Sequence, residues 1–439
     1  MRSLLALPLL LVVVAWPSAE AGRPLELHSA ARAAKVFIGL VGGLENARLA
    51  RLNETSFAPV GRPGPRLGSV DAWAFSPDGA QLAIAAHARG AGVFRDTIRL
   101  LNPRTLRLVR KPVVLNGMAR ALLWTRPDRI VALVVGDSNW SALVSVDVGS
   151  RRAVGTKVLE GNVTAIARTH DSLVLLVTPS NAIGAATVAT IDASGNVRSV
   201  ALSRISAGMS WPQDSTAPMI GTQRLPGLAV DAGGGRAYVI AADGPAAEVS
   251  LQTLAAAYHE LSGSRSTLAR LAAWLQPSAE AKGLNGPNRQ ARFLGDGLIA
   301  LTGSDETATA AGNSLTITSN PAGLAIVDTG DWTVRMLDRG ADSVTPASGA
   351  LLATGRTWSS AAQETHGMGL AVYNADRRLR FRLWSGTSSW VDAVWAGRAY
   401  VQVTNEGKAR FFVVDLASGT AVQRRTAVPI PLLGAGPDL

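Results

Sequence analysis

A unit of short apolar runs, each followed by tight-turn residues, recurs along the chain, and this repetition limits the fold more than any other feature. The clearest copy begins at Asp71 with an apolar run, turns at Ser76-Pro-Asp-Gly79, and continues as a second apolar run to Ala86. Pro fixes the backbone at one turn position, Asp caps the turn, and Gly accepts a positive φ angle. Two more runs follow between residues 96 and 109, so the unit predicts four antiparallel strands.

Six further copies follow the first one, and their runs are too short for core helices. They lie at 121–149, 163–196, 227–240, 297–328, 350–373 and 391–419. Four antiparallel strands in a period of about 45 residues are typical of a β-propeller blade. Because a blade packs against a neighbour on each face, its strands are expected to be apolar almost throughout rather than alternating.

The turn from Phe75 to Gly79 and the third-strand endings at Val327-Asp-Thr-Gly and Val414-Asp-Leu-Ala-Ser-Gly resemble those of bacterial secreted β-propeller repeat proteins, a WD-repeat-like group. The resemblance extends over almost the whole chain after the N-terminal segment. It implies an all-β propeller but names no activity, because this fold carries many unrelated functions. The Trp-Asp and Gly-His pairs of true WD units are missing.

Eight blades are predicted, with seven blades and a loose N-terminal arm as the alternative. The residues from Gly22 to Phe75 and from Trp395, in the last unit, to the C-terminus together amount to about two repeat lengths, one more than the last unit itself needs. An additional blade therefore fits across the chain ends. Its strands are expected at 35–41, 46–52 and 56–60, with 429–433 as the innermost strand, so that pairing of the two ends closes the ring. Pro429 and Pro431 are tolerable on such an edge strand.

The N-terminus has the layout of a secretory signal peptide. Arg2 precedes an apolar stretch from Leu4 to Ala15, and Ala19-Glu-Ala21 forms a small-residue cleavage site. We therefore expect a signal peptide over 1–21, a single propeller domain over 22–439, and a secreted or cell-envelope-associated protein. An uncleaved anchor is the alternative, but the apolar stretch is too short to span a bilayer as a helix.

Composition excludes several classes of protein. The 439 residues are 47% hydrophobic and include no cysteine, which argues against disorder, disulfide scaffolds and cysteine-ligated metals. The net charge of +11 is expected to lie on outer strands and third-to-fourth-strand turns, either as a solvated rim or as a surface for an anionic cell-envelope partner. Nucleic-acid binding, a membrane span and oligomer formation are not expected. The residues that predict this rim are Arg104, Arg107, Arg110, Lys111, Arg151, Arg152, Arg377, Arg378, Arg380, Arg382, Arg424 and Arg425.

The long connections of the predicted blades all fall on one face, at 203–225, 258–288, 303–320 and 355–367. Long loops in compact domains often carry function, so this face is the predicted ligand or partner surface. Within it, 266–276 has a helical pattern and predicts a short helix, either a lid or a packed element. The tract 302–314 is polar and predicts a flexible loop, and its Asp305-Glu306 pair is weak evidence for calcium.

Five residues in these connections are the candidate ligand-binding set: Trp211, Asp214, Arg356, Trp358 and His366. Tryptophan in a polar loop either stacks on a ligand or holds the loop against the body. No hydrolase, phosphate-loop or dinucleotide motif occurs, and the five histidines lack ligand spacing, so no catalytic residue, cofactor or metal is predicted. His87 and His366 both fall near second-to-third-strand connections and could converge.

These patterns favour an exported, non-enzymatic binding or scaffold module that engages a protein or glycan through the long-loop face. The alternative is a propeller hydrolase or lyase acting on a sugar or lactone at the mouth of the central channel. An enzyme of that kind requires two or more carboxylates or histidines to converge there with perturbed pKa values.

Overall fold

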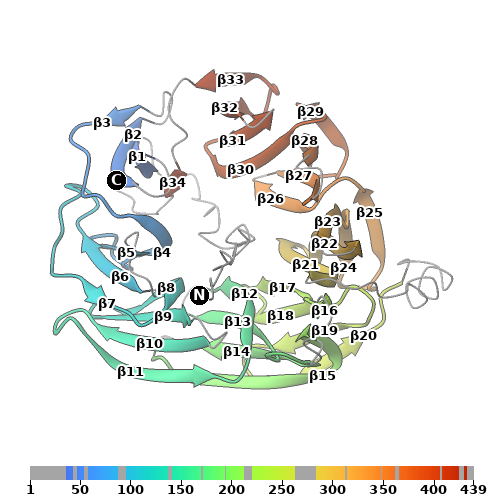
Figure 1. Ribbon diagram of the computed structural model, residues 1–439, viewed down its shortest axis with the longest axis horizontal. Helices are drawn as coiled ribbons and strands as arrows, with labels where there is room; N and C mark the ends of the chain where they lie inside the picture. Colours follow the sequence, from blue (N-terminus) through green and yellow to red (C-terminus); the bar gives the residue numbers. More distant parts are fainter. Residues whose placement is uncertain are drawn as a thin grey trace, which may run out of the picture.

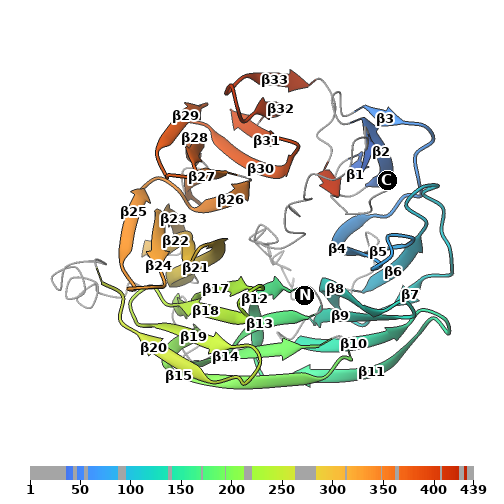
Figure 2. The same cartoon turned by 180° about the vertical axis from the view of Figure 1, so that it is seen from behind.

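The computed structural model describes residues 36–42, 47–53, 58–87, 95–136, 141–169, 172–192, 194–211, 220–262, 283–311, 314–347, 349–360, 365–405, 408–424 and 430–432. Antiparallel sheets stand side by side around a common centre in both views (Figures 1 and 2). The predicted all-β propeller is therefore confirmed. No helix occurs in the described part, and the predicted signal peptide and helix 266–276 lie outside it.

Five of the sheets have four strands each. In three of them the strands follow the chain from the inner strand outward: β4 (Ser69–Phe75) to β7 (Val113–Val114), β17 (Gly227–Asp231) to β20 (Ala256–His259), and β30 (Ser388–Trp395) to β33 (Ala421–Arg424). The fourth runs in the same way from β8 (Met118–Arg126) to β11 (Arg152–Leu159). Their middle strands are β5 (Leu82–His87), β6 (Asp96–Leu101), β9 (Arg129–Val135), β10 (Ser141–Asp147), β18 (Arg236–Ile240), β19 (Ala246–Ser250), β31 (Arg398–Asn405) and β32 (Lys408–Asp415).

The fifth four-stranded sheet joins the two ends of the described chain. Its order is β3 (Pro59–Val60), β2 (Arg48–Asn53), β1 (Val36–Val41) and β34 (Ile430–Leu432). Strand β34 pairs antiparallel with β1, with Gly39 opposite Pro431. Strands from near both ends of the described chain therefore belong to one sheet.

The remaining fourteen strands form one continuous sheet. Part of it repeats the four-strand pattern and part consists of additional strands that connect neighbouring sheets. Its members are β12 (Asn162–Arg168), β13 (Leu173–Thr178), β14 (Ile183–Ile191), β15 (Val197–Ser210), β16 (Ile220–Arg224), β21 (Gly283–Gly295), β22 (Leu298–Ala311), β23 (Ser314–Pro321), β24 (Leu324–Asp328), β25 (Val334–Asp338), β26 (Ser343–Ala347), β27 (Ala350–Ser359), β28 (Thr365–Asn374) and β29 (Leu379–Leu383).

Apolar side chains fill the space between neighbouring sheets. Along β9, Ile130, Ala132 and Val134 pack toward the β4–β7 sheet. Val131 and Leu133, which alternate with them, pack toward β12–β14. Both faces of the strand are therefore buried, which is the physical reason for the nearly continuous apolar runs in the sequence.

The predicted turn chemistry is present in the structure. Asp78 Oδ1 accepts a hydrogen bond from Ser76 Oγ at 2.5 Å, and Gly79 has a φ of 68°. At the third-strand ends, Asp147 and Asp415 accept backbone N–H groups of the turns that follow them. Hydrogen bonds from the backbone N–H of Ser150 and of Ser418 lower the pKa values of these two carboxyls. Both residues therefore form turns and are not an acid–base pair.

Several rim arginines connect neighbouring sheets. The guanidinium of Arg110 donates to the carbonyl of Gly149 at 3.2 Å, and that of Arg380 donates to Ala417 at 2.6 Å. Arg198 donates in the same way to Leu251 at 2.9 Å. Part of the basic rim therefore has a structural task, because each such bond ties an outer strand to the carbonyl groups of the next sheet.

Candidate functional site

Additional β-structure is built on one face of the ring. Strand direction identifies this face as the one that carries the second-to-third-strand and fourth-to-first-strand connections. There β16 pairs with β15 and runs parallel to β21, β23 pairs with β22, and the end of β27 pairs with β23 on one side and with the start of β28 on the other. We call β16, β23 and the adjoining ends of β15, β21, β22, β27 and β28 the annex sheet. It is the part of the fourteen-stranded sheet that lies beyond the four-strand units.

The predicted long connection 303–320 belongs to the annex sheet. It consists of β22 and β23 paired from Ser304–Pro321 to Ala311–Ser314, so the prediction of a flexible loop over 302–314 was wrong. Strand β22 changes partners near Gly303, where φ is 134° and a Cβ would lie 2.0 Å from the Asn288 carbonyl oxygen. Asp305 pairs with the buried Arg289 at 2.7 Å, so the Asp305-Glu306 pair is not a free acidic site.

The five predicted ligand-binding residues do not form one patch. Arg356 and Trp358 lie on β27 and project from the same side of the strand. His366 is exposed on β28 opposite Thr357, which places it on the other side of that strand pair. Trp211 is half-buried at the end of β15, and Asp214 lies outside the described residues.

Arg356 has a defined environment at this face. Its guanidinium lies over the ring of Trp390 on β30, 5.4 Å from the ring centroid. Its backbone N–H donates to Asp342 Oδ2 at 3.0 Å. Burial raises the pKa of Asp342 to about 6, and the hydrogen bond and the charge of Arg356 oppose this effect. Arg356 thus links the annex sheet to the first strand of the β30–β33 sheet.

A second group of polar residues lies on the inner strands, which are nearest the centre of the ring (Figure 1). Each of the strands β4, β8, β12 and β30 has a β-bulge near its start, where its pairing register with the next strand shifts by one residue. The extra residues at these bulges are Asp71, Arg120, Thr164 and Asp392. Bulges re-aim a side chain out of the regular alternation, so these four positions are structurally equivalent and polar in every case.

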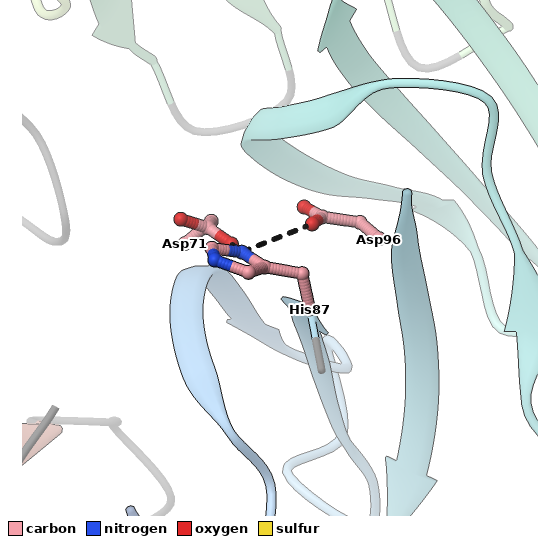
Figure 3. A group of neighbouring side chains, drawn as sticks. All are labelled: Asp71, His87 and Asp96. Carbon is pink, nitrogen blue, oxygen red and sulfur yellow. Dashed lines mark hydrogen bonds and ion pairs between the residues drawn. The ribbon is translucent and has the colours of Figure 1, made fainter. Parts of the chain in front are cut away.

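Asp71 belongs to a cluster with His87 and Asp96 (Figure 3). His87 ends β5, Asp96 begins β6, and the two residues pair across the strands. His87 Nδ1 lies 2.7 Å from Asp71 Oδ2 and 3.6 Å from Asp96 Oδ1. The Asp96 side chain is completely buried, whereas that of His87 is 33% exposed. The cluster therefore reaches solvent through the imidazole and extends inward to a buried carboxylate.

Asp96 also joins two sheets. Its Oδ2 accepts the backbone N–H of Ala119, on β8 of the next sheet, at 2.6 Å. Ser141 occupies the equivalent position in the β8–β11 sheet and accepts the N–H of Val163 at 3.5 Å. A hydroxyl therefore suffices for this contact between sheets, and the second oxygen of Asp96 is not needed for it. That oxygen, Oδ1, is buried, accepts no hydrogen bond and faces His87.

Burial makes the carboxyl groups of the cluster unusual. Burial, together with the negative charge of Asp71, raises the pKa of Asp96 to about 7. Burial also raises the pKa of Asp71, against the opposing effects of His87, of a hydrogen bond from the protonated Asp96 and of the positive charge of Arg120. Asp392, at the equivalent bulge of β30, is hydrogen-bonded by Gln402 at 3.1 Å, and burial raises its pKa to about 7.

Sequence reasoning missed this cluster. Asp71 and Asp96 were interpreted only as the first residues of apolar strands, and His87 as a lone histidine. The signal that could have found them is a charged or ionisable residue near the start of one strand, at the end of the next and at the start of the third. Because successive strands are antiparallel, these three positions lie at the same edge of the sheet. His87 and His366 do not meet, since β5 and β28 lie on different sides of the ring (Figures 1 and 2).

Comparisons with known proteins agree on the fold. No protein-family model matches the sequence, and no curated protein matches it significantly. Among solved structures, the chain is similar to the dihydro-heme d1 dehydrogenase NirN in complex with DHE, with 13% identity, coverage of 93% of this chain and 76% of that chain, and a TM-score of 0.54.

Two other solved structures are more distant in shape. A putative 6-phosphogluconolactonase from Bacteroides fragilis has 10% identity, coverage of 91% of this chain and 98% of that one, and a TM-score of 0.44. The β-propeller domain of Cps50 from Myceliophteria thermophila has 12% identity, coverage of 79% and 99%, and a TM-score of 0.41. At such identities a likeness to a solved structure shows the fold alone.

Proposed function

We propose that the protein is an exported eight-bladed propeller that binds a ligand on the face carrying the annex sheet. The count of eight takes the fourteen-stranded sheet as three blades, namely β12–β15, β21 with β22, β24 and β25, and β26–β29. Strands β16 and β23 then connect these blades, and the five four-stranded sheets complete the ring. Export follows from the signal-peptide pattern over 1–21, with the protein secreted or attached to the cell envelope.

One observation carries the binding function: all the additional β-structure of the annex sheet stands on a single face. Extra strands cost conformational entropy to order, and the propeller core does not need them. This face also presents the half-buried Trp358 and the Arg356–Trp390 stack, and aromatic and arginine side chains are common anchors in binding sites. A glycan or a protein segment is the class of ligand that such groups fit.

The test is a binding assay with cell-wall fragments and a glycan panel. We expect Trp358→Ala to weaken binding by about tenfold or more, which is the range for loss of one aromatic anchor. Trp211→Ala, at the end of β15, is the second variant. Arg107→Ala on the outer rim is the matched control, and it should leave binding unchanged. Unchanged binding in both tryptophan variants would refute a ligand site on the annex sheet, and loss in Arg107→Ala alone would move the site to the rim.

A hydrolase or lyase acting on a sugar or lactone is the second candidate function. The observation that favours it is the cluster of Asp71, His87 and Asp96, whose ligand-type atoms all lie within 4.8 Å of one another. Carboxyls with raised pKa values beside an imidazole are suited to proton transfer near neutral pH. In a panel of lactones and glycosides, this function requires turnover that His87→Val abolishes. Turnover that survives this substitution would exclude the cluster as the catalytic group.

A further inference from the structure

We infer that Asp71, His87 and Asp96 form a binding site for a divalent transition-metal ion, of which zinc is the type. Within the ranges described, this is the only group of three or more such side chains close enough to share an ion. The inference goes beyond the proposed ligand binding on the annex sheet and does not depend on it.

The distances fit a shared ion. Zinc lies about 2.1 Å from its nitrogen and oxygen ligands, so two ligands at tetrahedral angles are roughly 3.4 Å apart. His87 Nδ1 is 2.7 Å from Asp71 Oδ2 and 3.6 Å from Asp96 Oδ1, on either side of that value. Side-chain movements of a few tenths of an ångström would therefore place the three atoms around one ion. The ion would replace the hydrogen bond between His87 and Asp71.

Asp96 provides the independent indication of a ligand. Its Oδ1 is fully buried, accepts no hydrogen bond and faces the other two side chains. A buried carboxylate oxygen without a partner is costly, and coordination to a cation removes that cost. The other oxygen, Oδ2, is held by the N–H of Ala119 at 2.6 Å, which orients Oδ1 toward the site. Such outer contacts are a regular feature of metal ligands.

Comparison with the neighbouring sheet argues that the three residues are not required by the fold. The β8–β11 sheet has the same bulge and the same register, and its residues at the three positions are Arg120, Val135 and Ser141. None of these could complete a metal site, yet the sheet forms the same contacts. Three ligand side chains at corresponding positions are therefore an addition to the repeat.

The donor set indicates the class of metal. Imidazole nitrogen favours zinc and other transition metals, whereas calcium and magnesium take oxygen ligands. Three protein ligands would leave at least one coordination position for water or another ligand, the arrangement found in catalytic rather than structural zinc sites. The partial exposure of His87 places that position on the solvent side of the cluster.

The experiment uses the full-length mature protein without a histidine tag, stripped with a chelator. Calorimetric titration with Zn²⁺, Mn²⁺ and Ca²⁺ is followed by metal analysis after gel filtration. We expect one equivalent of zinc, weaker manganese binding and no saturable calcium binding. Because an ion bound only to the folded state stabilises it, zinc should also raise the melting temperature.

Two site variants and one control make the result specific. Asp96→Ser retains a hydroxyl for the contact with Ala119, as Ser141 does in the next sheet, and His87→Val copies Val135. We expect each to weaken zinc binding by at least about tenfold and to remove the zinc-dependent rise in melting temperature. Asp392→Asn changes a carboxyl at the equivalent bulge of β30 and should bind zinc like the wild type. Absence of saturable zinc binding in the wild type, or undiminished binding in both site variants, would overturn the inference.

Discussion

The β4–β7 and β8–β11 sheets are neighbours with the same strand register and the same bulge on the inner strand, and they differ in what three corresponding positions carry. One sheet has Asp71, His87 and Asp96. The other has Arg120, Val135 and Ser141 at the corresponding positions, so Ser141 is the equivalent of Asp96. Both sheets bond to the next one through the first residue of their third strand.

The difference separates what the repeat needs from what has been added to it. In these two sheets the contact with the next sheet includes a hydrogen-bond acceptor at the start of the third strand, and a hydroxyl can serve as that acceptor. The carboxylate of Asp96 has a second oxygen that this contact does not use. That oxygen is buried, accepts no hydrogen bond and lies beside the imidazole of His87. The isolated Asp392 is the third case, because it shares the bulge position but has only Gln402 as its partner.

The largest expected effect concerns that isolated carboxyl. Its pKa is raised to about 7 by burial, so the folded protein holds a proton there that the unfolded chain releases near pH 4. The stabilisation from that proton is complete below pH 4 and is lost as the pH rises toward 7, by at most about 4 kcal/mol. In Asp392→Asn this loss should be absent. Urea unfolding of both proteins from pH 4 to 8 measures it, and parallel pH profiles would show that Asp392 has an ordinary pKa.

The next effect tests the contact made by Asp96. Asp96→Ala leaves the N–H of Ala119 without an acceptor and should lower the free energy of unfolding by about 1–3 kcal/mol. The measurement is best made at pH 5.5, where the raised pKa keeps the wild-type carboxyl protonated. Asp96→Ser should lose less than half as much. If Ser and Ala are equally destabilising, the equivalence between Asp96 and Ser141 is wrong.

Removing the corresponding contact from the neighbouring sheet should cost less. The Ser141 bond to Val163 is 3.5 Å long, against 2.6 Å for the bond from Ala119 to Asp96. Ser141→Ala should therefore lower the free energy of unfolding by about 0.5–1 kcal/mol. Denaturant unfolding beside Asp96→Ala under the same conditions gives the ranking. A larger loss in Ser141→Ala would reverse the comparison.

The smallest effect on stability is expected when the cluster is converted to the pattern of its neighbour. The triple variant Asp71→Arg, His87→Val and Asp96→Ser copies all three positions of the neighbour, leaves no buried carboxyl without its partner and retains an acceptor for Ala119. Its free energy of unfolding without metal should stay within about 1 kcal/mol of the wild type, the usual range for substitutions without a cavity or an unpaired charge. A variant that fails to fold would show that the cluster belongs to the framework, and circular dichroism with thermal melting decides between these outcomes.

Much of the architecture could be predicted from local patterns. The Ser76–Gly79 turn and the buried strands on either side of it depend on interactions between residues close in sequence, and the structure has them where predicted. The annex sheet could not be predicted in this way. The tract that contains Ser314–Pro321 looks like a loop in the sequence because it is polar, although it forms a hairpin with β22. Its other edge pairs with β27, a segment that is distant in the chain.

The same distinction between local patterns and contacts of distant segments applies to the candidate site. The sequence by itself determined short strands, tight turns and apolar faces buried on both sides, because those follow from backbone geometry and side-chain polarity within a few residues. Only the tertiary structure decided that Asp71, His87 and Asp96 meet, and that Arg356 stacks on Trp390. A bulge, the strand register and the contact between neighbouring sheets place those side chains, and each depends on pairing between segments that are separate in the chain.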